Sequence, residues 1–297
     1  MSKRNVVRRD FIPGSEWVYF KIYAGSNTVD KLLVHEISQI IASLERRKLI
    51  EKWFFIRYAD PDFHLRIRLQ VLDRSMIGNV LQAFYGKLEK RISDKTVWKV
   101  QLDTYSRELE RYKKEFIELT EDLFCVDSRH VLLLLTKMHE KNMLEERFFI
   151  AMRTIDCLLN AFNLDISGKQ NLLEHIDAGF KSEFGYTQSN MKQLNALYRE
   201  YRPQISSAMN GLPIDIETAI QHYTVECAKI VERVEARDMR EALPSYIHMT
   251  MNRIFPSKNR IYELMSYNFL NRYYQSVIAR KHNETRKWKT NNLCVNR

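Results

Sequence analysis

The first third of the chain alternates between two kinds of hydrophobic pattern. Short runs rich in aromatic and β-branched residues predict strands over residues 17–23, 52–58, 64–69 and 96–102. Between these runs, apolar residues recur at helical spacing, which predicts helices over about 28–47 and 75–90. This order of elements is that of the split β-α-β, or ferredoxin-like, β-α-β-β-α-β arrangement, with both helices on one face of the sheet.

After Tyr105 the apolar positions follow a helical period as far as residue 280. The predicted helices span 106–123, 128–140, 143–163, 169–182, 188–209, 215–236, 240–254 and 258–280. The expected fold class is therefore α+β, with an N-terminal ferredoxin-like sheet domain over 1–105 packed against a C-terminal helical domain over 106–280. Residues 281–297 are polar and basic without periodicity, so they are expected to form a disordered tail.

Composition argues against several function classes. Gly accounts for only 8 of 297 residues, and no phosphate-loop, dinucleotide-binding, zinc-protease or nucleophile-elbow motif is present. The four cysteines lie far apart and form no CxxC pair, so we expect neither a metal site nor disulfides, and a cytoplasmic location is the simplest. No apolar run approaches the roughly 20 residues of a membrane-spanning helix, and no secretory signal is recognisable. We therefore expect no cofactor and no membrane association.

The formal net charge of +10 favours anionic partners such as RNA, phosphates or carboxylate-bearing peptides. The strand over 64–69 offers them a surface, because residues two apart on a strand share a face. Its apolar residues are expected to face the helices, so that the opposite face carries His64, Arg66 and Arg68. Guanidinium groups in such a row bind carboxylates or phosphates in bidentate fashion. The alternative is an ordinary solvated face, which weakens if the helical domain covers it, since buried arginines need anionic partners.

Two other segments carry charged or titratable residues at helical spacing. Glu108 and Arg111 are three apart, and they either complete an anion site or form an ordinary surface ion pair. His248 and Asn252 are four apart, with Ser245 one turn earlier. His248 is either a proton carrier or a satisfied core histidine. Spacing alone leaves both questions open.

Together these segments resemble a known family. Residues 53–61, followed by 64–68, are similar to the WFFIRYxDPxxHLRLR signature of the thiopeptide-type bacteriocin biosynthesis domain, the C-terminal elimination part of class I lantibiotic dehydratases. Further matching segments, in the family's order, are 13–19, 103–105, 108–112, 127–128, 248–249 and 252–253. The resemblance covers about residues 11–280. Lys113 and Lys114 stand where the family usually has Gly-Gly, so the helix after Arg111 is expected to start or bend differently.

The resemblance implies a function. In full-length dehydratases, an N-terminal domain transfers glutamate from glutamyl-tRNA to Ser or Thr of a ribosomally made precursor peptide. The C-terminal domain then eliminates that glutamate and leaves dehydroalanine or dehydrobutyrine. Because this chain resembles only the second part, it is expected to be a stand-alone lyase that needs a separate glutamyl-tRNA-dependent glutamylating protein. Full-length relatives tend to form dimers, which leaves a homodimer as one option.

This elimination requires removal of an α-proton, stabilisation of enolate-like charge and accommodation of a departing carboxylate, and arginines on an enclosed face can serve the last two needs. On this hypothesis, the strand arginines hold the glutamyl group and the enolate oxygen, and a histidine carries the proton as base or acid. The expected catalytic residues are Arg66, Arg68, Arg111 and His248. Those expected to bind or orient the substrate are His64, Glu108, Asn252 and Arg253.

Two other functions compete with this reading. Some stand-alone relatives join two dehydroalanines in a [4+2] cycloaddition that builds the pyridine of thiopeptides, although they usually depart from the elimination residues. A non-catalytic module that binds a leader peptide or RNA is the third option, since the net charge and a free sheet edge could serve binding alone.

Overall fold

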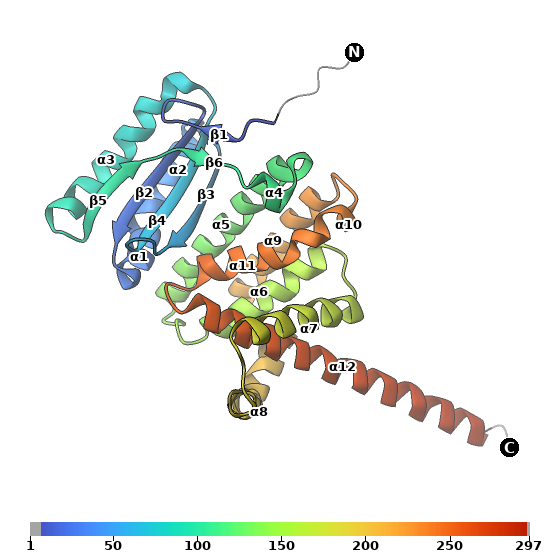
Figure 1. Cartoon of the computed structure of the whole chain (residues 1–297). Coiled ribbons are helices and arrows are strands. Elements are labelled where there is room, and N and C mark those ends of the chain that lie inside the picture. Colours follow the sequence, from blue (N-terminus) through green and yellow to red (C-terminus); the bar gives the residue numbers. More distant parts are fainter. Residues whose placement is uncertain (1–6, 296–297) are drawn as a thin grey trace, which may run out of the picture.

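The computed structural model describes residues 7–295, and their side chains as far as residue 284 (Figure 1). The strands are β1 (Asp10–Phe11), β2 (Trp17–Ala24), β3 (Ile50–Tyr58), β4 (His64–Val71), β5 (Val97–Leu102) and β6 (Tyr105–Ser106). The helices of the N-terminal part are α1 (Ser26–Leu32), a π-turn (Leu33–Ile37), α2 (Ser38–Arg46) and α3 (Ile77–Ser93). The remaining helices are α4 (Leu109–Tyr112), α5 (Ile117–Glu140), α6 (Arg147–Ala161), α7 (Ile166–Glu183), α8 (Gln188–Asn210), α9 (Ile214–Val231), α10 (Ala236–Met239), α11 (Leu243–Ile254) and α12 (Asn259–Val295).

The main sheet has four strands in the order β3-β4-β2-β5, and its neighbouring strands are antiparallel. All the strands expected from the sequence are confirmed, and their ends differ by no more than two residues. In β4, the alternation is as predicted, because Leu65, Ile67 and Leu69 are fully buried. The stacking of Phe20 on Phe84 of α3 identifies this side of the sheet as the one that the N-terminal helices cover. The mixed sheet-and-helix class is therefore confirmed.

The continuous helix expected over 106–123 is wrong in its first part, whereas residues 117–123 are helical as predicted, within α5. Residues 105–106 instead form β6, which pairs with β1 near the N-terminus, and α4 is a single turn. The cause is tertiary: Arg107 is buried and donates through Nε and Nη2 to the Glu121 carboxylate at 2.7 Å each. A buried bidentate ion pair fixes this segment in an extended course that local helix propensity does not predict.

The helix break expected between residues 123 and 128 is also absent, because α5 runs unbroken from Ile117 to Glu140. Asp127 and Ser128, which can cap helices, instead lie in its middle and are buried. Their side chains bond to other elements: Asp127 accepts from Tyr223, and Ser128 accepts from the backbone of Phe55. Polar side chains with tertiary partners do not compete with the helix backbone, so the helix continues.

The free edge of β3 joins the sheet to the helices that follow. Its outward backbone N–H groups at Trp53 and Phe55 donate to Cys125 Sγ at 3.5 Å and Ser128 Oγ at 3.1 Å, both on α5. An exposed strand edge invites pairing with other chains, and covering it with a helix prevents this. Figure 1 shows α5 beside β3 along this edge.

Helix α11 covers the rest of the β3 edge. Asn252 accepts from the Arg57 N–H at 2.8 Å and donates to the Arg57 carbonyl at 2.9 Å, which imitates a neighbouring strand. Arg253 donates to the Phe55 carbonyl at 2.8 Å and to Asp127 at 2.6 Å. The sheet and the helices are thus joined by side chains bonded directly to the backbone of β3. The division into two domains at residue 105 stays a prediction.

The last helix, α12, continues to Val295, where a frayed tail was expected from residue 281 onwards. The segment contains neither Gly nor Pro, the residues that stop a helix most strongly, and this accounts for the helical backbone. Residues 296–297 lie outside the described part. Within the described residues, no helix combines the length and apolar character needed to cross a bilayer.

Candidate functional site

The face of the sheet opposite α1–α3 carries a cluster of cations and aromatic rings. Arg68, in the middle of β4, lies over the rings of Tyr19, Phe54 and Tyr105 at 4.4, 5.4 and 5.0 Å from their centroids. Its side chain is buried, and within the described residues it forms no ion pair and no hydrogen bond, its Nε included. Burial lowers the pKa of this guanidinium, which nearby tyrosines and Glu108 oppose in part. Arg68 is therefore a buried cation held by aromatic faces alone.

Arg66, two residues earlier, is held by different partners. Its Nε donates to His64 Nε2 at 2.9 Å, and its guanidinium lies 3.4 Å from the centroid of the Tyr58 ring. His64 Nδ1 lies 2.8 Å from the Asp62 carbonyl, so Nδ1 donates there and Nε2 is free to accept. Burial lowers the pKa of His64, which favours this neutral form. His64 thus orients Arg66, as an orienting residue should.

Arg111 and Glu108 form the expected pair. Arg111 Nη1 lies 3.2 Å from Glu108, and Arg111 Nε donates to Ser245 Oγ on α11 at 3.0 Å. Both charged side chains are largely exposed, so the pair itself adds little stability. The hydrogen bond from Arg111 to Ser245 ties the segment after β6 to α11, the helix that carries His248. The charge of Glu108 also acts on Arg68, where it opposes in small part the lowering of the pKa by burial.

Lys113 has a backbone φ of 61°, in the left-handed region that favours glycine. It follows α4 directly, where the resembled family usually has Gly, and its ammonium pairs with Glu241 at 2.7 Å. The chain therefore makes the bend with a lysine, and Arg111 still reaches α11.

His248 lies on α11 one turn beyond Ser245, on the same side of the helix. Its Nδ1 is 2.8 Å from Oε1 of Glu263, a fully buried residue of α12. A carboxylate only accepts, so Nδ1 donates and Nε2 is left to exchange a proton. His248 is half-buried, which gives a ligand access to the ring. Its role as a proton carrier stays a prediction.

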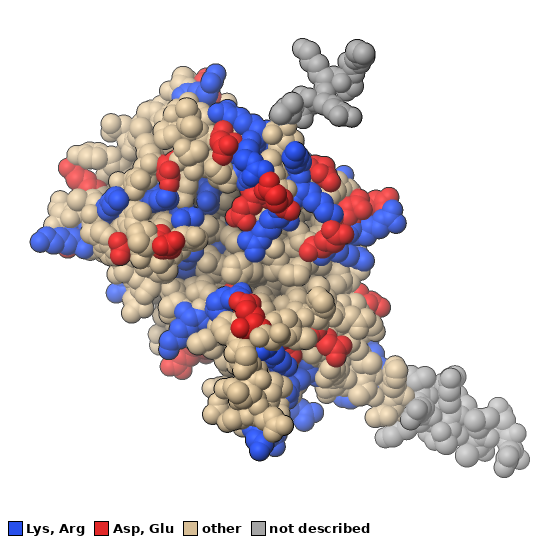
Figure 2. Space-filling view, in the orientation of Figure 1, with Lys and Arg blue, Asp and Glu red and all other residues tan. Residues whose placement is uncertain are grey.

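Arg66 and Arg68 lie on the face of the sheet opposite α1–α3, and Arg111 is hydrogen-bonded to α11. Aromatic rings pack where the sheet meets the helices. The ring centroids of Phe54 (β3) and Phe124 (α5) are 5.5 Å apart, and those of Phe124 and Tyr112 are 5.3 Å apart. Figure 2 shows Lys and Arg side chains over the sheet and along its border with the helices, with Asp and Glu among them. Within the described residues, no hydrogen bond or ion pair links His248 to either strand arginine, so their convergence belongs to the proposal below.

Asn252 and Arg253 lie elsewhere. The Asn252 amide is engaged with the backbone of β3, and Arg253 is fully buried against Asp127. Both side chains therefore join the sheet to the helices, and a role of either in binding the substrate stays a prediction. Glu263 and the three rings around Arg68 were not expected from the sequence, since they come from segments far apart in the chain. The three rings lie in segments that carry the family resemblance, 13–19, 53–61 and 103–105, and this is the signal that could have found them.

Within residues that the structure describes, His, Cys, Asp and Glu side chains form no group of three or more suited to a metal ion.

The chain is similar to two proteins of lantibiotic biosynthesis. The chain is 32% identical over 143 residues to the nisin biosynthesis protein NisB of Lactococcus lactis subsp. lactis, a match that covers 46% of this chain. It is 23% identical over 281 residues to the subtilin biosynthesis protein SpaB of Bacillus subtilis, which covers 90% of this chain. The matches span only 14% and 26% of those two proteins.

Solved structures share the fold. The tRNA-dependent lantibiotic dehydratase MibB from Microbispora sp. 107891 matches 91% of this chain and 29% of its own length, with a TM-score of 0.58 and 18% identity. The pyridine synthase TbtD, from thiomuracin biosynthesis, matches 88% of this chain and 99% of its own length, with a TM-score of 0.61 and 13% identity. The model of the lantibiotic biosynthesis dehydratase C-terminal family matches residues 17–274, most of the chain, and the protein therefore belongs to that family.

Proposed function

We propose that this chain carries out the elimination step of a peptide dehydratase. It takes a ribosomally made precursor peptide that has been glutamylated on Ser or Thr, and it eliminates the glutamate to give dehydroalanine or dehydrobutyrine. The family supports dehydratase chemistry, and the strand order β3-β4-β2-β5 supports a ferredoxin-like arrangement for the sheet that carries the arginines.

One observation carries the proposal: Arg68 is a buried guanidinium without an acidic partner within the described residues. Burying a cation is costly unless it is paired. The negative charge that develops on the enolate oxygen during elimination provides the missing partner. The aromatic rings around Arg68 exclude water and leave the guanidinium free to meet an anion, where its effect is strong because the local dielectric is low.

The reaction follows from these groups. His248 Nε2 takes the α-proton of the glutamylated residue, since Nδ1 is committed to Glu263. The electron pair moves to the carbonyl oxygen, which a strand guanidinium stabilises as an enolate. When the enolate collapses, the Cβ–O bond breaks and glutamate leaves as a carboxylate, and on this proposal Arg66 and Arg111 bind its two acidic groups. The products are the dehydro residue, free glutamate and a protonated His248.

A pyridine-forming cycloaddition is the second candidate, because the chain matches nearly the full length of TbtD. The identity of 13% supports a common fold alone. Arg66, Arg68, Glu108, Arg111 and His248 are all present, which favours elimination.

The test is to incubate the purified chain with a peptide glutamylated on Ser or Thr and to follow its mass. We expect loss of one glutamic acid per modified residue. Replacing the buried cation (Arg68→Gln) or the proton carrier (His248→Ala) should slow this by about 10²-fold or more, as for loss of a charge-stabilising or acid–base group.

A matched control is Lys99→Gln, which removes a cation of the same sheet face that lies over Tyr23 and should leave the rate nearly unchanged. Circular dichroism of all variants checks that they are folded. Turnover of the glutamylated peptide by the folded Arg68 and His248 variants at the parental rate would disprove the assignment. Conversion of a dehydrated azole peptide instead, with loss of water and leader, would establish the cycloaddition. Peptide binding without turnover, weakening steeply with salt, would indicate a binding module.

A further inference from the structure

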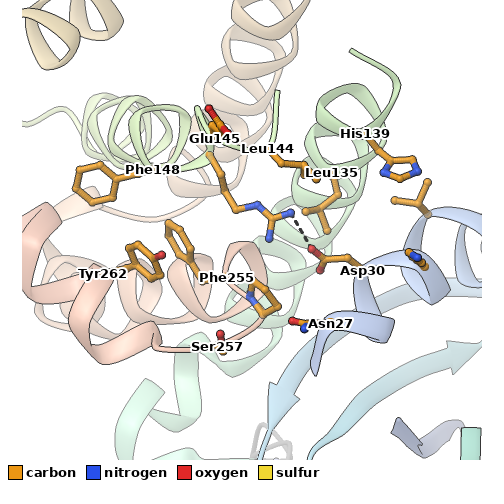
Figure 3. A pocket seen from close by; sticks show the side chains of 14 residues that line it. Asn27, Asp30, Leu135, His139, Leu144, Glu145, Phe148, Phe255, Ser257 and Tyr262 are labelled. Atoms are coloured by element: carbon orange, nitrogen blue, oxygen red, sulfur yellow. Dashed lines mark hydrogen bonds and ion pairs between the residues drawn. The ribbon is translucent and has the colours of Figure 1, made fainter. Parts of the chain in front are cut away.

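A cavity lies at another part of the boundary between the sheet and the helices. This cavity, of about 480 Å³, opens between α1, the end of α5, the start of α6 and the loop after α11 (Figure 3). This volume is within the range of small-molecule sites. None of the residues assigned above to the elimination lines it, so the cavity is separate from the proposed catalytic site.

The polar end of the cavity holds an excess of positive charge. Asp30 accepts from Arg57 at 2.6 Å through one carboxylate oxygen and from Arg147 at 2.7 Å through the other. Burial alone would raise the pKa of Asp30, but the charges of the two arginines outweigh it and hold that pKa low. One carboxylate therefore balances two buried guanidinium groups. Arg147 lines the cavity, its side chain is 11% exposed, and its buried Nε has no hydrogen-bond partner.

The other end of the cavity is aromatic. The rings of Phe255 and Tyr262 stack at 4.1 Å with an interplanar angle of 10°, and Phe148 lies 6.2 Å from Tyr262. Figure 3 shows these three rings together on one side, with Asp30 and His139 on the opposite side. The other charged lining residues, Lys31 and Glu145, are exposed and of opposite sign, so they do not alter the balance.

We propose that this cavity binds a small organic acid, in which one carboxylate meets Arg147 and an apolar, preferably aromatic, body lies against Phe148, Phe255 and Tyr262. Arg147 Nη1 donates to the Ile254 carbonyl at 3.4 Å and Nη2 to Asp30, so within the described residues Nε is the nitrogen without a partner. The guanidinium supplies a charge-assisted donor, and the rings bury the apolar part. Such a group is either a free acid or the C-terminal residue of a peptide.

The test uses the full chain and 3-phenylpropionate as the probe, with binding followed by calorimetry. We expect a dissociation constant of about 1 mM or tighter, as for a ligand of this size. The neutral amide of the probe should bind at least about tenfold more weakly, and Arg147→Gln should weaken binding of the acid by a similar factor. The matched control is Arg153→Gln on the same helix, whose guanidinium pairs with Asp156 and Glu217 and does not line the cavity.

Tyr262→Leu keeps the arginines and should also weaken binding. It provides a second test if the Arg147 variant does not fold. A tripeptide ending in Phe, compared with its C-terminal amide, distinguishes the sources: binding of the free-acid form alone identifies a peptide C-terminus, and failure of both forms identifies a free acid. No binding of the probe at 10-fold its expected dissociation constant, equal binding of acid and amide, or unchanged binding by both cavity variants would overturn the proposal.

Discussion

Arg253 gives the sharpest test of how the two parts of the molecule are joined. Its side chain is fully buried, with Nε on the Phe55 carbonyl at 2.8 Å and Nη1 on the Asp127 carboxylate at 2.6 Å. Asp127 also accepts from Tyr223 and Thr250, but these hydroxyl groups are neutral. Replacing the arginine with methionine keeps most of the side-chain volume and removes the charge.

The loss of unfolding free energy in Arg253→Met follows from the groups that lose their partner. Asp127 would remain buried without a cation, and the Phe55 carbonyl would lose its partner at the edge of β3. Removing one member of a buried ion pair costs roughly 3–5 kcal/mol. A protein of this kind is stable by about 5–15 kcal/mol in total. We therefore expect Arg253→Met to reduce the free energy of unfolding by about 4 kcal/mol.

Equilibrium urea unfolding, followed by circular dichroism, measures this change. Arg237→Met is the control, because Arg237 is mostly exposed and pairs only with exposed acids, so its midpoint should not move. Adding Asp127→Asn to Arg253→Met removes the stranded charge and should recover part of the loss. A decrease below about 1 kcal/mol, or a double variant less stable than the single one, would refute the reasoning.

Two further substitutions test other parts of the structure. Burial lowers the pKa of His130 to about 3, so below its ordinary pKa the unfolded chain binds a proton that the folded protein does not. Stability should therefore fall by about 1.4 kcal/mol per pH unit as the pH drops from about 6.5 towards 3, and His130→Phe should flatten this part of the urea midpoint–pH profile. An unchanged slope would contradict the burial argument. Lys113→Gly should raise the melting temperature by roughly 2 °C, because relief of the positive φ outweighs loss of an exposed ion pair. Lys113→Ala, which loses the pair but keeps the φ, should lower it, and a glycine variant that melts below the parent would show that the bend is unstrained.

The strands could be read from the sequence because their signal is local. Alternation in β4 placed Leu65, Ile67 and Leu69 on the covered face and the charged residues on the other, as the burial confirms. The start of the helical part could not be read in this way. The pairing of β6 with β1 and of Arg107 with Glu121 joins residues that no local pattern relates.

The separate roles of His248, Asn252 and Arg253 could not be read from the sequence either. His248, Asn252 and Arg253 stand close together on α11, yet they contact α12, the edge of β3 and the buried Asp127 in turn. Successive residues on a helix point about 100° apart, so one motif serves several surfaces. A sequence motif can identify such residues without separating the chemical ones from those that hold the fold together.

Arg66 and Arg68 differ in burial, and this difference predicts different roles in the proposed reaction. Arg66 is partly exposed and its orientation is fixed by His64 and Tyr58, so it is suited to capture an incoming carboxylate from solvent. Arg68 is buried, and Coulomb interactions there are less screened. Charge that develops only during the reaction therefore gains more from Arg68 than from Arg66. On the proposed function, Arg66→Gln should mainly raise KM, whereas Arg68→Gln should mainly lower kcat, and the reverse pattern would exchange their roles.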